Sequence, residues 1–169
     1  MEYGIKGNLV HGLYRKFDLD GQLCHQTSYH LGKEHGLARQ YANGKVIGTY
    51  RMKHGTGADL WYEREGCLSE ERYYQDGKRH GFERWWNWDN KTIHQESHFC
   101  MDLQHGIVRE WNSQGKLRRG FPQYYIQGQK VNRRKYLAAA NSDPTLPPFS
   151  EKDNLPRRPL PLKWMEAFR

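Results

Sequence analysis

Glycines recur along residues 7 to about 130 at a spacing that severely limits the folds open to the chain. Five of them, separated by 21 to 25 positions, mark equivalent points of a repeat: Gly12, Gly36, Gly57, Gly81 and Gly106. Five positions after each stands an aromatic residue: Phe17, Tyr41, Tyr62, Trp86 and Trp111. A second turn residue follows a few positions later: Gly21, Gly44, Gly66, Asn90 and Gly115. This concordance indicates five copies of one structural unit.

Each unit is too short for a pair of helices and is interrupted by a turn residue about every ten positions. Two short strands joined by tight turns fit this length, and Asp20-Gly21 and Asn43-Gly44 are typical of hairpin turns that need a positive φ. The sequence therefore predicts an all-β fold, an elongated antiparallel meander of about five β-hairpin repeats, over residues 1–130.

The repeat stops after Gly128, and the remaining chain has a different character. Residues 131–141 are rich in Ala and basic residues, and Asn132 is a suitable N-cap, so we expect a short helix that caps the last hairpin. Residues 142–169 form a Pro-rich basic tail, which we expect to be extended. Such a tail either lies along the sheet or is presented to a partner.

The repeated residues resemble a known family. The pattern of Gly, four residues and an aromatic resembles the MORN repeat, and the connection Gly32-Lys-Glu-His-Gly, repeated at Gly77, resembles its bacterial YwqK-type variant. The likeness covers residues 7 to about 128, with departures at Thr56 and Asn90. It implies binding to proteins or lipid surfaces, and an antitoxin or immunity role.

Alternation along the first strand of each unit assigns its residues to two faces of the sheet. One face is expected to carry an arginine column: Arg15, Arg39, Arg84 and Arg109. These guanidinium groups either stack on neighbouring aromatic rings or grip an acidic partner. The opposite face is expected to carry Trp61 and Trp85, with Trp88 in the adjoining turn, as an aromatic patch that either binds a partner or is covered by the tail.

The net charge of +8 belongs to the C-terminal third of the chain, because acidic and basic residues balance before residue 116. One interpretation is an anion-binding arm for nucleic acid or anionic lipid. The other is a helix with a solvated basic surface. The residues of this arm are Arg118, Arg119, Arg133, Arg134, Lys135, Arg157 and Arg158.

Catalytic, cofactor and metal sites are not expected. The sequence contains no nucleophile-base pairing, P-loop or dinucleotide fingerprint. Histidines precede four of the five anchors, but each belongs to a different hairpin, so their imidazoles are expected to bind turns rather than converge on a metal. Three cysteines without a CxxC pair, and no long apolar stretch or export signal, indicate a cytoplasmic protein with no transmembrane segment.

The sequence therefore predicts a non-enzymatic scaffold for binding another macromolecule. A protein partner is the first expectation, such as a cognate toxin. The alternatives are nucleic-acid or anionic-lipid binding through the basic C-terminal segment, and an accessory subunit of a larger bacterial complex.

Overall fold

The computed structural model describes residues 1–64 and 66–161 of the chain. Strands make up most of it, joined by tight turns. They are β1 (Glu2–Lys6), β2 (Leu9–Phe17), β3 (Leu23–His30), β4 (Lys33–Glu34), β5 (Gly36–Ala42), β6 (Lys45–Lys53), β7 (Thr56–Arg64), β8 (Cys67–Gln75), β9 (Lys78–Trp86), β10 (Ile93–Cys100), β11 (Leu103–Gln104), β12 (Gly106–Glu110), β13 (Gln123–Ile126) and β14 (Gln129–Val131). The helix α1 (Arg133–Ala140) and a 3₁₀ turn, η1 (Glu151–Asn154), follow.

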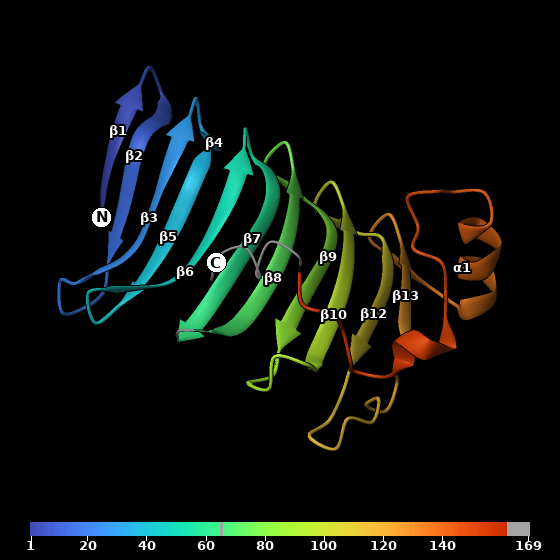
Figure 1. Ribbon diagram of the computed structural model, residues 1–169. Helices are drawn as coiled ribbons and strands as arrows, with labels where there is room; N and C mark the ends of the chain where they lie inside the picture. The colour runs from blue at the N-terminus through green and yellow to red at the C-terminus, as the bar shows by residue number, and fades with distance from the viewer. Residues whose placement is uncertain (65, 162–169) are drawn as a thin grey trace.

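The strands form one open sheet in which chain neighbours pair antiparallel. The order is β1-β2-β3-β5-β6-β7-β8-β9-β10-β12-β13-β14, and the two-residue strands β4 and β11 pair with β3 and β10. Figure 1 shows the strands side by side, twisting progressively from the N-terminal edge to α1 at the other end. The all-β meander predicted from the glycine spacing is confirmed.

The turns adopt the backbone conformations that the sequence suggested. Asn43 and Gly44 both have positive φ, at 51° and 72°, as a two-residue hairpin turn requires. Asn90, which stands where the other repeats have Gly, also has a positive φ of 53°. Its side-chain Oδ1 accepts a hydrogen bond from Leu68 N at 3.1 Å. Asparagine thus replaces glycine here at little steric cost and adds a contact with the preceding repeat.

Successive turns at one end of the strands are hydrogen-bonded to one another, and we call this series the turn ladder. Gly32 N donates to Val10 O at 2.8 Å, and Gly55 N donates to Glu34 O at 2.7 Å. Gly77 N donates to Gly55 O at 2.8 Å, and a Cβ on Gly55 would lie 2.6 Å from that nitrogen. The close approach of two turns therefore requires glycine at position 55.

Three of the four histidines before the anchors bind the next turn, as expected, whereas Nδ1 of His80 is buried without a hydrogen-bond partner among the described residues. Nδ1 of His11, His35 and His105 accepts a hydrogen bond from a backbone N–H of the next turn, at 3.0–3.3 Å. In the third repeat Thr56 replaces histidine, and its Oγ1 accepts from Asp76 N at 2.9 Å. The threonine hydroxyl supplies the same acceptor, so the ladder continues through the irregular repeat.

Two apolar clusters stabilise the sheet. The larger centres on Leu60, Leu68 and Trp86, and the proline-rich tail contributes Leu160 to it. The smaller lies at the C-terminal end, where Tyr136 of α1 is fully buried with its ring 5.2 Å from that of Tyr124 in β13. Asn132 caps α1, as predicted, by accepting from Lys135 N at 2.9 Å.

The described part of the predicted tail, residues 142–161, lies along the sheet, and residues 162–169 lie outside the described residues. After α1 the chain returns across the face of β12 and β10 (Figure 1). Ile93 N donates to Pro156 O at 2.9 Å, and the Trp111 indole donates to Asn154 O at 2.7 Å. These contacts cover one face of the sheet in its C-terminal half.

Candidate functional site

Strand register assigns the repeated positions to two faces, in agreement with the alternation read from the sequence. On one face Leu60 pairs with Glu71, Glu71 with Arg84, Arg84 with Glu96, and Glu96 with Arg109, which forms a continuous row across five strands. This is the face that the tail covers. On the other face Trp61 pairs with Glu70, Glu70 with Trp85, and Trp85 with Gln95. We call the second set the tryptophan row.

The tryptophan row carries half-buried indoles on a face that the described tail segment does not cross. The ring of His25 stacks on Trp61 at 5.1 Å between centroids. The Arg72 guanidinium lies 5.7 Å from the ring centre of Trp85. Trp88, by contrast, lies in the turn after β9, is 64% exposed, and has Arg64 over its ring. The structure thus aligns two of the three predicted tryptophans and leaves the third at the strand ends.

Carboxylates from three strands surround a single arginine beside the tryptophan row, and we call this group the acidic cluster. Its members are Asp59, Glu70 and Glu83, around Arg72. Arg72 contacts Glu70 directly, with Glu83 at 3.8 Å and Asp59 at 4.0 Å. Arg79 adds a second positive charge, 3.6 Å from Glu83. Three carboxylates face two guanidinium groups, so the cluster has an excess of one negative charge when all of them are ionised, which favours cations.

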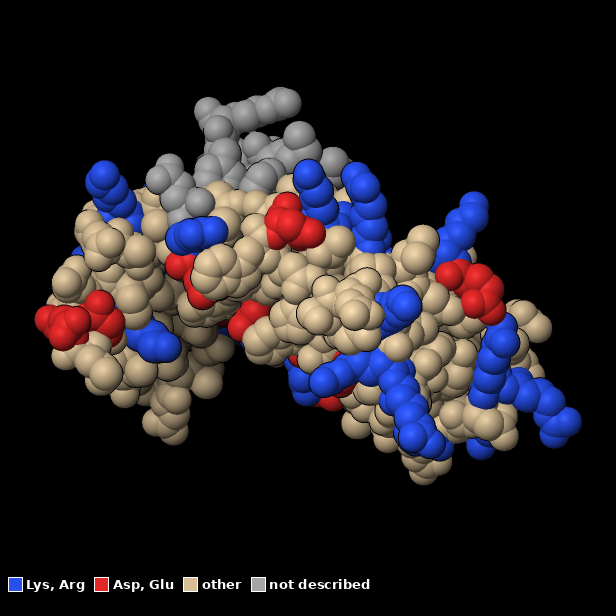
Figure 2. Space-filling view, turned by 90° about the horizontal axis from the view of Figure 1, so that it is seen from below, with Lys and Arg blue, Asp and Glu red and all other residues tan. Residues whose placement is uncertain are grey.

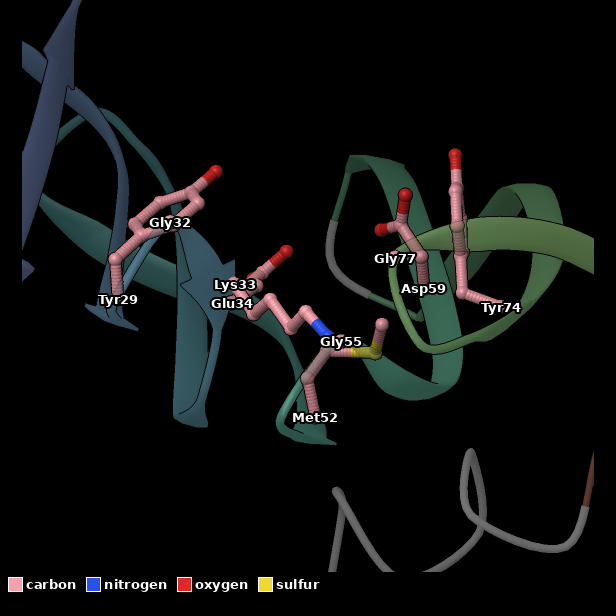
Figure 3. Close-up of a pocket in the computed structure, with 9 residues that line it drawn as sticks. All are labelled: Tyr29, Gly32, Lys33, Glu34, Met52, Gly55, Asp59, Tyr74 and Gly77. Carbon is pink, nitrogen blue, oxygen red and sulfur yellow. The ribbon is translucent and has the colours of Figure 1, made fainter. Parts of the chain in front are cut away.

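A cleft of about 250 Å³ opens next to the acidic cluster, and we call it the tyrosine cleft. Figure 3 shows Tyr29 and Tyr74 on opposite sides of it, with the carboxylates of Glu34 and Asp59 facing each other across the gap. Glu34 Oε1 accepts a hydrogen bond from the Thr27 hydroxyl at 2.7 Å, which fixes that carboxylate.

Asp59 is unusual among these carboxylates because its surroundings satisfy it poorly. It is only 8% exposed; its Oδ1 makes no well-aligned hydrogen bond in the described part of the chain, and the Trp61 indole N–H is a weakly placed donor to this carboxylate. Burial raises the pKa of Asp59 to about 6, and the nearby charge of Glu34 adds to this, while Trp61 and Arg72 oppose it. A buried carboxylate in such a state costs stability unless something else solvates it.

The predicted arginine column divides into an exposed and a buried half. Arg15 lies near the N-terminal edge and pairs with Glu2 at 3.3 Å, and Arg39 is half-buried. Arg84 and Arg109 lie beneath the tail, where Glu96 accepts from both, at 2.8 and 3.1 Å. The sequence left open whether these arginines stack on aromatic rings or bind an acidic partner. Arg84 stacks on a ring, because its guanidinium lies 4.4 Å from the centre of the Phe82 ring, and it also pairs with Glu96.

Arg158 from the tail completes this group, which we call the arginine cluster: Arg84, Arg109 and Arg158 around Glu96. Arg158 donates to both carboxylate oxygens of Glu96, from Nε and Nη2, each at 2.9 Å. Burial alone would raise the pKa of Glu96, but Arg158 and Arg84 together lower it to about 2. The cluster fastens the tail to the sheet and leaves these three arginines shielded from a partner.

The other basic residues predicted for the anion-binding arm are scattered over the C-terminal end. Arg118 pairs with Glu110 at 3.4 Å, and Arg133 pairs with Glu151 at 3.0 Å. The exposed remainder are Arg119, Arg134, Lys135 and Arg157. Figure 2 shows several Lys and Arg side chains at the end of the molecule formed by the last hairpin and α1, and others spread over the rest of the visible face.

The histidines lie closer together than the sequence suggested, because the stacked turns bring neighbouring hairpins into contact. Rings of His35 and His54 are 4.2 Å apart between centroids, and His30 lies 5.3 Å from His54. Desolvation, and then electrostatic interaction with His35 and His30, lowers the pKa of His54. Within residues 1–64 and 66–161, no group of three or more His, Cys, Asp or Glu side chains is arranged to hold a metal ion.

His25 gives the protein a predicted pH dependence. Burial, and then the charge of Lys16, lowers the pKa of His25 to about 4, whereas an unfolded histidine titrates near 6.5. Stability that is present above pH 6.5 is therefore lost as the pH falls toward 4. Between pH 7 and pH 5 we expect the stability of the wild type relative to His25→Gln to fall by about 2 kcal/mol, measured by urea unfolding.

The wild type must be compared with His25→Gln because Asp59 also titrates in this pH range. The pKa of Asp59 is raised, so its contribution to stability increases as the pH falls from 7 to 5, opposite to that of His25. Since Asp59 is present in both proteins, its contribution cancels in the difference. A difference that stays constant from pH 7 to pH 5 would contradict the assignment of a neutral, buried His25.

Within the described ranges, no helix is long and apolar enough to cross a membrane. No protein-family model matches the chain, and searches of curated proteins and of solved structures return no match either. The resemblance to MORN repeats therefore remains a prediction that rests on the repeated residues.

Proposed function

We propose that the protein is a non-enzymatic, cytoplasmic scaffold that binds a protein partner through the tryptophan row and the acidic cluster. The observation that carries this proposal is the alignment of Trp61 and Trp85 beside a group of carboxylates on a single face of the sheet. Half-buried tryptophans ringed by polar groups are typical of interface hot spots. The acidic cluster contains more carboxylates than guanidinium groups, and this excess negative charge favours a partner with a basic surface.

The proposed partner-binding face does not include the arginine column, which the sequence had offered as a possible partner-binding surface. Arg84 and Arg109 are held by Glu96 under the tail, so engaging a partner would require breaking buried ion pairs. Trp61 and Trp85 need no such rearrangement. An antitoxin or immunity role remains one specific form of the proposal, supported by the repeat resemblance, and an accessory role in a larger complex is another.

Trp85→Ala is the variant that tests the proposal most directly. Wild-type protein is used to capture partners from an extract of its source cells, and affinity for the purified partner is then measured by calorimetry. Loss of a hot-spot indole typically removes about 2 kcal/mol or more, so we expect affinity to fall roughly 30-fold. Circular dichroism establishes that the variant retains the sheet.

A second candidate function is anion binding by the basic end, favoured by the exposed Arg119, Arg134 and Lys135. The triple variant of these residues to Ala serves as the matched control. It should bind the protein partner as the wild type does. If the triple variant loses the captured molecule while Trp85→Ala retains it, and binding weakens steeply with salt, the second candidate replaces the first.

A further inference from the structure

We propose that two copies of this chain pair through the edge strand β1, antiparallel, about a two-fold axis at Gly4. β1 is the first strand of the sheet, and among the described residues it pairs with β2 alone. All five residues of β1 are exposed, and Figure 1 shows the strand at the N-terminal edge of the molecule. A sheet edge with open backbone groups is a template for another strand.

Large apolar side chains are exposed along this edge. Tyr3 is 52% exposed and Ile5 is 65% exposed. Soluble proteins usually protect an edge strand with charges, proline or a covering segment. In β1 the charges stand at the two ends of the strand, as Glu2 and Lys6, and leave the apolar pair between them. A second strand at this edge would remove Tyr3 and Ile5 from water.

Hydrogen bonds on the far side of β2 show that the backbone groups of Ile5 face outward. Val10 lies opposite Ile5, and its carbonyl accepts from Gly32 N at 2.8 Å, on the side away from β1. In an antiparallel ladder, opposed residues direct their backbone groups either toward each other or away from each other. The N–H and C=O of Ile5 therefore point to the open edge.

The backbone groups of Tyr3 face outward for the same reason. Ser28 O accepts from His35 N at 2.8 Å, so the backbone groups of Ser28 point away from β2. Those of the preceding residue, Thr27, point toward Tyr14, its partner in β2. Tyr14 is therefore bonded to β3, and Tyr3, which lies opposite it in β1, directs its N–H and C=O to the open edge.

Pairing about Gly4 matches both the backbone groups and the charges. Tyr3 then lies opposite Ile5 of the second copy, so the outward backbone groups form hydrogen-bonded pairs. Glu2 lies opposite Lys6 of the second copy, and the symmetry creates two such ion pairs. Shifting the register by two residues in either direction removes both ion pairs. Charge complementarity therefore selects this register and a second copy as the occupant.

The other edge of the sheet is less suited to such pairing. β14 has three residues, and the chain continues from it into α1. The basic end of the molecule also lies there, at the opposite end of the sheet from β1 (Figure 1), so its charge does not oppose association at β1. Pairing of β1 with β14 of another copy would not close and would produce open-ended polymers.

The dimer would present two tryptophan rows on the same side. Tyr3 lies near Tyr14, with 6.5 Å between ring centroids, and Tyr14 pairs with Thr27. His25 is two residues from Thr27 on the same face and stacks on Trp61. A two-fold axis perpendicular to the sheet keeps this face on one side in both copies. Bivalent binding by the dimer rests on the proposed function, but the dimer itself does not.

Sedimentation equilibrium of the full chain, with no tag at its N-terminus, tests the proposal at concentrations from about 10 to about 500 µM. Strands of this length bury less than a standard interface, so we expect a monomer–dimer equilibrium with a Kd on the order of 100 µM. Glu2→Lys and Lys6→Glu should each weaken association about tenfold, because each variant places like charges opposite one another.

An equimolar mixture of these two variants should associate about as strongly as the wild type, because opposite charges face each other in the mixed dimer. Lys45→Glu is the matched control, since it makes the same change at the exposed first residue of β6. It should associate as the wild type does. Ile5→Pro removes an outward N–H, which an edge strand tolerates, and should abolish the dimer while circular dichroism shows that the sheet remains.

The proposal is overturned if the wild type stays monomeric over the whole range or forms species larger than a dimer. It is also overturned if a charge variant or Ile5→Pro associates as the wild type does, if the mixture fails to restore association, or if Lys45→Glu weakens association equally. Since no partner is present in these measurements, their outcome is separate from that of the capture experiment with Trp85→Ala.

Discussion

Glu96→Gln is expected to lower the free energy of unfolding by about 3 kcal/mol. Glu96 is 2% exposed and is the common acceptor of Arg84, Arg109 and Arg158, two of which are themselves almost fully shielded from water. A neutral amide can still accept hydrogen bonds, but it removes the negative charge that offsets the desolvation of three guanidinium groups. Removing one partner from a buried ionic network is costly because the remaining charges stay in a poorly hydrated environment.

Urea unfolding at pH 7 measures this loss, and Glu110→Gln is its control. Glu110 is in the neighbouring strand and pairs with Arg118, whose side chain is 62% exposed, so the same change of charge there should alter stability by less than about 1 kcal/mol. If the two variants lose similar amounts, then the arginine cluster contributes no more than a surface ion pair, and the anchoring of the tail must come from its apolar and backbone contacts.

Gly48→Ala is expected to destabilise the protein by about 3 kcal/mol through steric conflict. A Cβ built on Gly48 in β6 would overlap ring atoms of Tyr62, a buried residue of β7. In the register of β6 with β7, Met52 and Lys53 are the β6 residues that pair, and farther along β6 the Tyr62 ring lies against Gly48. Accommodating one methyl group therefore requires moving an aromatic side chain in the larger apolar cluster.

A double-mutant cycle with Tyr62→Leu separates this conflict from any change in backbone preference. Tyr62→Leu alone should be destabilising, but in its presence Gly48→Ala should cost less than about 1 kcal/mol, because the smaller side chain leaves room for the methyl group. Thermal unfolding of the four proteins provides the comparison. If the cost of Gly48→Ala is the same in both backgrounds, then the ring is not the cause.

The architecture could be predicted from the sequence because it depends on local signals that recur. Gly and Asn at the turns, and alternation along each first strand, determined the order of the meander and placed Trp61 and Trp85 on one face. The bonding of His11 and His35 to neighbouring turns followed from the same periodicity. Signals that are repeated several times constrain one another, so errors at single positions have little effect.

The acidic cluster and the tyrosine cleft could not be predicted in this way. Asp59 occupies a position where the other repeats have Tyr14, Ala38, Glu83 and Val108, so periodicity gives no indication of it. Recognising Arg72 as its neighbour required the pairing register of β7 and β8. The contribution of Glu96 could have been suspected, because Glu71 and Glu96 stand 25 positions apart in the strands that separate the arginines.

The buried position of Arg158 could not be predicted from the sequence for a different reason, which is the distance along the chain between the two partners. Its charge was noticed in the sequence, but its buried position was not, because the contact with Glu96 spans 62 positions of the chain. Nothing local in a proline-rich segment specifies which face it will cover. Only the assembled sheet provides the complementary charge.

The turn ladder also bears on how such a molecule can change over generations. The hydrogen bonds of the ladder join each turn to the turns beside it, through backbone groups and one small acceptor that is histidine in some repeats and threonine in another. Whole units can therefore be gained or lost without disturbing the contacts of those that remain. The length of the ligand-facing surface can grow or shrink in increments of one hairpin, and individual units are free to acquire singular residues such as Asp59.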